Sequence, residues 1–210
     1  MPFGLINAPV TFQAYINKAL IGLLDLIAVT YMDNILVFSY PGENHTEHVR
    51  TVLLRLRKYG LYVNLSKCEF DTTVVDFLGY RISTAGVSMD PSRVQAILEW
   101  PTPSSFRDIQ VFLGFANFYR GFILLYSTVT VPISDLLVGM VKGKKAGPFE
   151  WTKAADDAFR LLKERFSSAP MIVHFDWVRL TRVKVNASGG AYGGVLTQAY
   201  NIQGDRRQTV

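Results

Sequence analysis

The order of apolar and polar residues predicts a helix followed by a hairpin at the start of the chain. A helical repeat of apolar residues covers residues 8–24, with Pro9 suited to a first turn. Two β-prone runs follow at 27–32 and 35–40, and only Asp33-Asn34 separates them. Because Asp and Asn tolerate positive φ values, we expect a two-residue turn with both side chains at its tip.

Further helical and strand patterns follow this hairpin. Residues 46–59 carry one apolar stripe and end at Gly60, which predicts a second helix with one buried face. Short β-prone segments lie at 61–65 and 74–82. Helices and strands therefore alternate, and the predicted fold class is α+β.

A change of pattern near Ala85-Gly86 predicts a boundary, with helices beyond it. Asp90-Pro91 opens a short helix that ends before Pro101. Ser105 and Asp108 form a capping-box pattern at the start of a longer helix over 106–125. This helix has many aromatic residues and few charges, so we expect it to be largely buried.

The last third of the chain changes from helix to strand. Residues 139–148 predict an exposed linker, and 152–166 form an amphipathic helical pattern. Short β-prone runs at 182–185 and 191–197 flank a glycine-rich turn. That turn lacks the G-x-G-x-x-G spacing of a phosphate loop, which favours a tight strand connection.

Composition narrows the class of protein. The chain has 210 residues, of which 49% are hydrophobic and 19% charged, and this excludes disorder. Cys68 is the single cysteine, which argues against a disulfide framework and favours an intracellular location. The longest apolar tract, 20–32, is interrupted by Asp25 and is too short to span a membrane.

The positive charge is unevenly distributed. The net charge is +5; residues 1–44 carry one base and three acids, whereas 101–145 carry five bases and two acids. A basic middle segment fits a nucleic-acid track, but it also fits an ordinary solvated surface, and charge leaves both interpretations open.

Four motifs give the chain a resemblance to a known family. The resemblance rests on the order and spacing of residues 1–13 (MPFGLINAPVTFQ), 31–34 (YMDN), 77–80 (FLGY) and 112–120 (FLGFANFYR). In these motifs the chain resembles the reverse transcriptase of gypsy-type LTR retrotransposon Pol polyproteins. Phe149-Glu150-Trp151 resembles the family's connection to RNase H, and Val185-Asn186-Ala187-Ser188 resembles the first RNase H strand.

The resemblance implies three parts in an α+β fold. Residues 1–85 would form a partial reverse transcriptase palm, a ferredoxin-like sheet with helices. Residues 86–140 would form thumb and connection helices. Residues 141–210 would form the N-terminal part of an RNase H-like domain.

The resemblance also implies a polymerase that uses two Mg²⁺ ions. Asp33 matches the first metal-binding carboxylate of the family's Tyr-x-Asp-Asp motif, and Asn34 occupies the position of the second. Asn34 brings no formal charge, and a further family carboxylate falls upstream of the region matching Met1. We therefore expect a truncated, degenerate copy that is catalytically inactive alone. Without the flanking motifs, the same four residues would indicate an ordinary hairpin turn.

Other family positions imply contacts with substrates. Phe3 and Gly4 fall where the family lines the incoming dNTP, although Phe3 also suits a core position. Leu78, Gly79 and Tyr80 fall at the position of the family's primer grip, which contacts the primer phosphates. The alternative interpretation of these residues is a buried strand without a binding role. Two thumb bases are expected to contact the phosphates of an RNA/DNA template–primer, and they are Arg107 and Arg120.

Two further hypotheses remain open at the level of sequence. The chain could be a non-catalytic remnant that binds nucleic acid or a partner, since Asn186 also replaces an RNase H aspartate. It could instead be a relic without a selected role, which would self-associate through exposed truncated surfaces. His45 and His48 have no third ligand nearby and are expected to be exposed and uncoordinated.

Overall fold

The computed structural model describes residues 6–138, 148–176, 178–187, 192–202 and 205–209. The chain divides into two compact units, residues 1–72 and 73–210. Phe3 and Gly4 lie outside the described residues, as does nearly all of the predicted 139–148 linker. No helix in the described part combines the length and apolar character that crossing a membrane requires.

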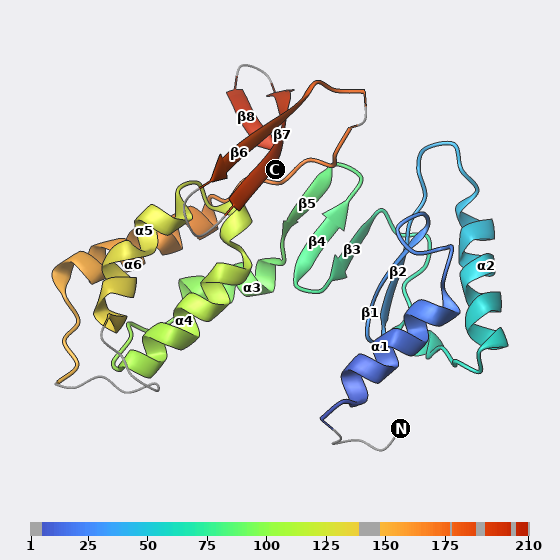
Figure 1. Cartoon of the computed structure of the whole chain (residues 1–210), viewed down its shortest axis with the longest axis horizontal. Coiled ribbons are helices and arrows are strands. Elements are labelled where there is room, and N and C mark those ends of the chain that lie inside the picture. Colours follow the sequence, from blue (N-terminus) through green and yellow to red (C-terminus); the bar gives the residue numbers. More distant parts are fainter. Residues whose placement is uncertain (1–5, 139–147, 177, 188–191, 203–204, 210) are drawn as a thin grey trace. The chain divides into compact units, whose positions relative to one another are not determined.

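The first unit packs a β-hairpin against two helices (Figure 1). Its elements are α1 (Ala8–Ala19), β1 (Ala28–Tyr31), β2 (Asn34–Val37), α2 (His45–Lys58) and the 3₁₀ turn η1 (Leu65–Lys67). The two strands are antiparallel. Its buried core consists of Ile16, Leu20, Ala28, Val52 and Leu56.

The helix α1 is shorter than the apolar pattern predicts. It ends at Ala19, although apolar residues continue to Leu24. Gly22 and Asp25 adopt φ values of 79° and 62° in the segment that follows. These left-handed conformations are incompatible with a continuing helix, so the chain turns there to reach β1.

The second unit combines two antiparallel sheets with four α-helices (Figure 1). One sheet has the order β3-β4-β5, with β3 (Val74–Phe77), β4 (Tyr80–Ser83) and β5 (Gly86–Met89). The helices are α3 (Pro91–Leu98), α4 (Phe106–Phe118), α5 (Tyr126–Ser134) and α6 (Lys153–Ser167), with the 3₁₀ turns η2 (Arg120–Phe122) and η3 (Asp135–Leu137). The other sheet has the order β6-β7-β8, with β6 (Thr181–Ala187), β7 (Tyr192–Ile202) and β8 (Asp205–Thr209).

The helices of this unit enclose one apolar core. Its largest fully buried side chains come from α3, α4, α5 and α6, and they are Ile97, Ile109, Phe112, Ile133, Leu162 and Phe166. The predicted caps are present, because the Asp90 carboxylate accepts from Ser92 N–H and Ser105 Oγ accepts from Asp108 N–H. The predicted α+β class is confirmed.

Several predicted elements differ in detail. The single β-prone run at 74–82 is a hairpin, because Leu78 and Gly79 adopt φ values of 53° and 82° and reverse the chain. The helix predicted over 106–125 ends at Phe118, and α5 was not predicted. The sequence of α5 includes Pro132 and several β-branched residues, which are poor helix formers.

The strand β5 forms a further backbone contact with the segment that precedes β6. Val87 N–H donates to Ile172 O at 2.7 Å, and Ile172 N–H donates to Val87 O at 2.8 Å. A Cβ atom on Gly86 would lie 2.3 Å from Ile172 O. Glycine at this position is therefore required for the close approach of the two segments.

Candidate nucleic-acid interface and hairpin site

The β1–β2 turn differs by one residue from the sequence prediction. Tyr31 pairs with Asn34, so the two-residue loop is Met32-Asp33 and Asn34 is the first residue of β2. Met32 carries the positive φ, 51°, and not Asp33 or Asn34. The predicted Asp33-Asn34 turn was therefore wrong, although the side chains of both residues are exposed next to each other at the end of the hairpin.

A hydrogen-bond network from α1 holds this turn in place. The half-buried Gln13 accepts a hydrogen bond from Met32 N–H through Oε1. Gln13 Nε2 donates to Asn17 Oδ1 at 2.8 Å and lies 3.3 Å from Thr30 Oγ1. Thr30 Oγ1 also donates to Asn17 Oδ1 at 3.2 Å. Gln13 thus accepts the hydrogen bond of a backbone amide in the turn. The pattern of hydrophobic residues does not predict this contact.

The donor set at this turn does not fit a pair of Mg²⁺ ions. Asp33 supplies one carboxylate, and the neighbouring Asn34 supplies only a neutral amide. Within the described ranges, no three His, Cys, Asp or Glu side chains lie close enough together to hold a metal ion. Hard divalent ions prefer several carboxylate oxygens, and this part of the chain presents one.

Three further site residues were predicted from the sequence, and they are Phe3, Gly4 and Asn186. Phe3 and Gly4 lie outside the described residues. Asn186 is placed only through its backbone, in β6, where it pairs with Gly193 of β7. Their roles stay predictions.

The predicted primer-grip residues form the tight turn of the β3–β4 hairpin. Phe77 pairs with Tyr80, and the turn residues Leu78 and Gly79 both have positive φ, the combination found in type I′ turns. Gly79 O accepts hydrogen bonds from Asp90 N–H and from Tyr119 Oη, each at 3.1 Å. The turn is therefore held from two sides, and Leu78 is 37% exposed.

Tyr80 lies in an aromatic cluster formed with the end of α4. Its ring is stacked on Phe118 and Phe122, with centroid distances of 5.2 Å and 6.0 Å, and meets Tyr119 edge-on. Burial raises the pKa of Tyr80. Phe118 remains 54% exposed, so the aromatic cluster reaches the surface beside the hairpin.

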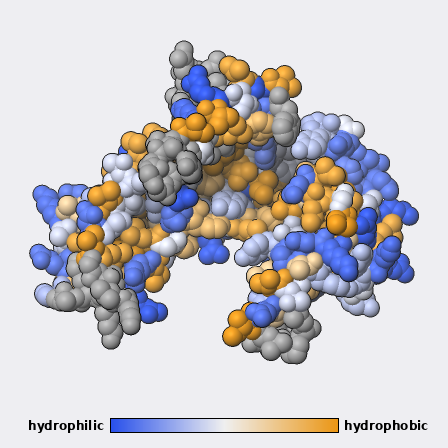
Figure 2. Space-filling view, in the orientation of Figure 1, coloured by the Kyte–Doolittle hydropathy of each residue, from blue (hydrophilic) through white to orange (hydrophobic). Residues whose placement is uncertain are grey.

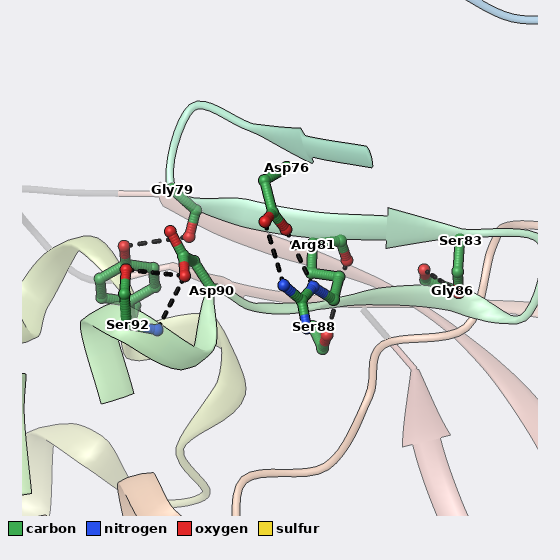
Figure 3. A network of polar contacts seen from close by, with 9 residues as sticks. Asp76, Gly79, Arg81, Ser83, Gly86, Ser88, Asp90 and Ser92 are labelled. Carbon is green, nitrogen blue, oxygen red and sulfur yellow. Dashed lines mark hydrogen bonds and ion pairs between the residues drawn. The ribbon is translucent and has the colours of Figure 1, made fainter. Parts of the chain in front are cut away.

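An ion pair crosses the same hairpin. Asp76 and Arg81 are directly opposite each other in the register, and two bonds of 2.9 Å and 3.0 Å join their carboxylate and guanidinium (Figure 3). The hydrogen bond from Arg81 lowers the pKa of Asp76. The pair neutralises Arg81, so the base nearest the turn is already engaged within the hairpin.

One face of α4 is exposed along its whole length, contrary to the expectation of a largely buried helix. The exposed residues include Arg107, Gln110, Gly114 and Asn117, and Arg120 follows just beyond the helix. Asp108 is the single acid of α4, and its carboxylate accepts from Ser104 N–H and Oγ. These bonds lower the pKa of Asp108. The exposed face therefore carries Arg107 and Arg120 at its two ends, and the ionised Asp108 lies next to Arg107 in the sequence.

A shallow pocket of about 490 Å³ adjoins this face, between α4 and α5. Arg120 is the one charged residue in its lining. The remaining lining residues supply hydroxyl, amide and apolar groups, and they are Leu113, Gly114, Asn117, Tyr126, Ser127, Thr130 and Ser134. This chemistry suits an anionic ligand.

Comparison with known families agrees with this arrangement of elements. Residues 1–82 match the family model of reverse transcriptase (RNA-dependent DNA polymerase). Residues 151–207 match the model of the RNase H-like domain found in reverse transcriptase. The comparisons support a retrotransposon Pol reverse transcriptase/RNase H region.

Relatives with similar sequences include transposon polyproteins. The chain is 35% identical over 201 residues to the transposon Tf2-7 polyprotein of Schizosaccharomyces pombe and 34% identical over the same length to Tf2-3. The match covers 96% of this chain and 15% of each polyprotein, so the chain spans only a small part of these relatives.

Solved structures share the fold. The foamy viral protease-reverse transcriptase, solved in complexes with dsDNA and with an RNA/DNA hybrid, gives TM-scores of 0.77 and 0.74 at 22% and 23% identity. The matches cover 94% and 98% of this chain, and 34% and 27% of those chains. They confirm the predicted fold class.

Proposed function

We propose that this chain is part of a gypsy-type reverse transcriptase and binds an RNA/DNA template–primer through its second unit. The four sequence motifs and the family matches support this assignment. The foamy viral neighbours, which share the fold, were solved with dsDNA and with an RNA/DNA hybrid. The single structural observation that carries the proposal is the exposed basic face of α4.

The α4 face has the properties that a phosphate backbone requires. Arg107 and Arg120 are exposed at its two ends, and they outnumber the one nearby acid, Asp108, whose carboxylate accepts hydrogen bonds from Ser104. Gly114 lies between them, and a Cβ at that position would meet no other atom within 4 Å. The face is thus open at its centre and has an exposed arginine at each end, which favours contact with phosphates.

Titration of a fluorescent RNA/DNA hybrid into the full chain at several salt concentrations tests this proposal. Arg107→Ala and Arg120→Ala should each weaken binding by about 3–10-fold and lower the slope of log K against log salt by about one. Arg160→Ala is the matched control, because Arg160 is also exposed but is paired with Asp156 on α6. Equal affinities of all four proteins would contradict the proposal, as would an absence of binding at low salt.

We also propose that these residues alone do not catalyse nucleotidyl transfer. Asp33 and Asn34 together provide a single negative charge at the hairpin end, where the family motif has two. Loss of a charge that helps to neutralise the reacting phosphates costs several kcal/mol of transition-state stabilisation, or orders of magnitude in rate.

Primer extension on poly(rA)/oligo(dT) with Mg²⁺ or Mn²⁺ tests this second statement. The purified chain should give no more incorporation than its Asp33→Asn variant, which removes the remaining carboxylate. Incorporation by the wild type that the variant lacks would show that the chain is an active polymerase, and the statement would then be wrong.

Self-association is a further part of the proposal. Several large apolar residues are exposed, including Tyr62 at 98% and Val178 at 94%. Hydrophobic residues also lie among the hydrophilic ones on the face shown in Figure 2. Exposed apolar surface favours association between chains. Sedimentation at increasing protein concentration should show a rising average mass, and a constant monomer mass would exclude it.

A further inference from the structure

The turn of the β3–β4 hairpin is attached to the C-terminal end of α4 through one side chain. Tyr119 follows the last residue of α4, and its Oη donates to Gly79 O across 40 positions of sequence. Gly79 O also accepts from Asp90 N–H. A carbonyl oxygen has two lone pairs, so these two donors use its full capacity and fix its direction.

The contact requires glycine at position 79 for two separate reasons. Gly79 has a φ of 82°, a conformation that residues with a Cβ rarely adopt. In addition, a Cβ at this position would lie 2.7 Å from Tyr119 Oη, which is closer than Cβ atoms approach other heavy atoms in proteins. The next nearest atoms, of Tyr119 and Phe118, are at 3.8 Å and 3.9 Å. Among these neighbours, the Tyr119 hydroxyl is therefore the one group that a side chain at position 79 would clash with.

The ring that carries this hydroxyl is itself held firmly. Tyr119 is 3% exposed, and aromatic neighbours surround it. The neighbouring rings belong to Tyr80, Phe115, Phe118 and Phe122, and their centroids lie between 4.8 Å and 6.5 Å from the centroid of the Tyr119 ring. Burial raises the pKa of Tyr119, so the hydroxyl keeps the proton that it donates. The donor is thus fixed in place and permanently protonated near neutral pH.

We infer that Tyr119 is a positioning residue that joins the β3–β4 turn to α4, so that Leu78, Phe118 and the exposed α4 face engage nucleic acid as one rigid surface. This inference rests on the proposed function for its binding role. The link itself is a property of the fold and is measured independently of any ligand.

A double-mutant cycle in thermal stability tests the link. Gly79→Ala should lower Tm by about 4–8 °C in the wild type, since both the strained φ and the clash with Oη oppose it. In the Tyr119→Phe background the clash is removed and only the strain remains, so the loss should fall to about half. Equal losses in the two backgrounds would overturn the inference.

Amide exchange gives a second measurement that needs only Tyr119→Phe, a variant that keeps the buried ring. The Asp90 amide, which shares Gly79 O with the tyrosine hydroxyl, should exchange about 3–10-fold faster in this variant. An unchanged exchange rate would show that the hydroxyl does not hold the turn.

Affinity for the fluorescent RNA/DNA hybrid tests the binding role. Tyr119→Phe should weaken binding by about 3–10-fold at a temperature where the variant is fully folded. Tyr15→Phe is the matched control, because Tyr15 Oη also donates to a backbone carbonyl, Tyr59 O, at 2.7 Å, but in the first unit. Wild-type affinity in Tyr119→Phe would overturn the inference and leave the proposed function intact, whereas no binding by the wild type would overturn both.

Discussion

At the scale of single residues, Gln13 shows how one side chain fixes a turn. Its amide accepts from Met32 N–H and donates to Asn17, so both ends of the amide are used. Gln13→Leu has a similar volume but leaves the half-buried Met32 amide without its acceptor. We expect the free energy of unfolding to fall by about 1–2 kcal/mol.

Urea denaturation and the exchange rate of the Met32 amide would measure this effect. Lys18→Leu on the exposed side of α1 is the control, and it should change the free energy of unfolding by less than about 0.5 kcal/mol. If Gln13→Leu were as stable as the control, the network would have no part in holding the turn.

Tyr126 predicts a loss of stability at alkaline pH. Burial raises its pKa from 10.0 to about 12 in the folded protein. An acid whose folded pKa is raised binds its proton more tightly in the folded state, so its contribution to stability is complete below pH 10 and is lost as the pH rises toward about 12.

Chemical denaturation across this alkaline range would measure the effect in wild type and in Tyr126→Phe. The variant should lose stability less steeply, because it lacks the titrating Tyr126 hydroxyl, whereas Tyr80 and Tyr119 titrate in both proteins. Parallel curves would show that Tyr126 does not contribute.

The sequence identified Asp33 and Asn34 but placed their turn one residue too late. The propensity of Asp and Asn for positive φ favoured that position, whereas the Gln13 bond to Met32 N–H stabilises the other. His45 and His48 were expected to be exposed, yet both are half-buried, and each Nδ1 lies 2.8 Å from Ser39 Oγ. Both differences come from tertiary hydrogen bonds, which local sequence does not encode.

At the scale of elements, two glycines predict opposite responses to the same substitution. Gly114 lies within α4 with open space at its Cβ position, whereas a Cβ on Gly86 would lie 2.3 Å from Ile172 O. Gly114→Ala should raise the free energy of unfolding by about 0.5–1 kcal/mol, because alanine loses less backbone entropy in a helix. Gly86→Ala should lower it by about 2–4 kcal/mol through the clash.

The two variants serve as controls for each other in urea denaturation. If Gly86→Ala were neutral, the strand β5 and the segment at Ile172 would not be in close contact. Destabilisation by Gly114→Ala would show that this position of α4 is not open.

Local signals predicted some elements well and missed others. Caps at Asp90 and Ser105 are local chemistry, and both were predicted and are present. The helix α5 was missed because its residues have low helical propensity, and its stability comes instead from burial of Val129 and Ile133 in the core. Where packing opposes local propensity, sequence reasoning alone fails.

At the scale of the whole molecule, each unit has its own apolar core. One core lies around Leu20 and the other around Phe112, and both of these side chains are fully buried. Phe112→Ala should lower the free energy of unfolding of the second unit by about 3–5 kcal/mol. Leu20→Ala should lower that of the first unit by about 2–5 kcal/mol.

Residue-resolved hydrogen exchange would follow the two units separately. Each variant should lose amide protection mainly in its own unit. A uniform loss of protection across residues 6–138 in either variant would show that the two cores unfold as one.

The division of the structure into two units differs from the predicted division into parts. Residues 74–83 fall within the predicted palm, yet their hairpin packs with the helices of the second unit. Tyr80 contacts Phe118 and Phe122, and those contacts are between residues far apart in sequence. The predicted boundaries at 85 and 140 stay predictions.

The backbone contact between β5 and Ile172 joins the β3–β4–β5 sheet to the segment that precedes β6. His174 Nε2 reinforces it with a bond of 2.7 Å to Ser83 O, and the chain continues from there into β6. The β3–β4–β5 sheet is therefore hydrogen-bonded to the segment that leads into β6, and β6 lies within residues 151–207, which match the RNase H-like model. Separating the sheet from that segment would require these three hydrogen bonds to break.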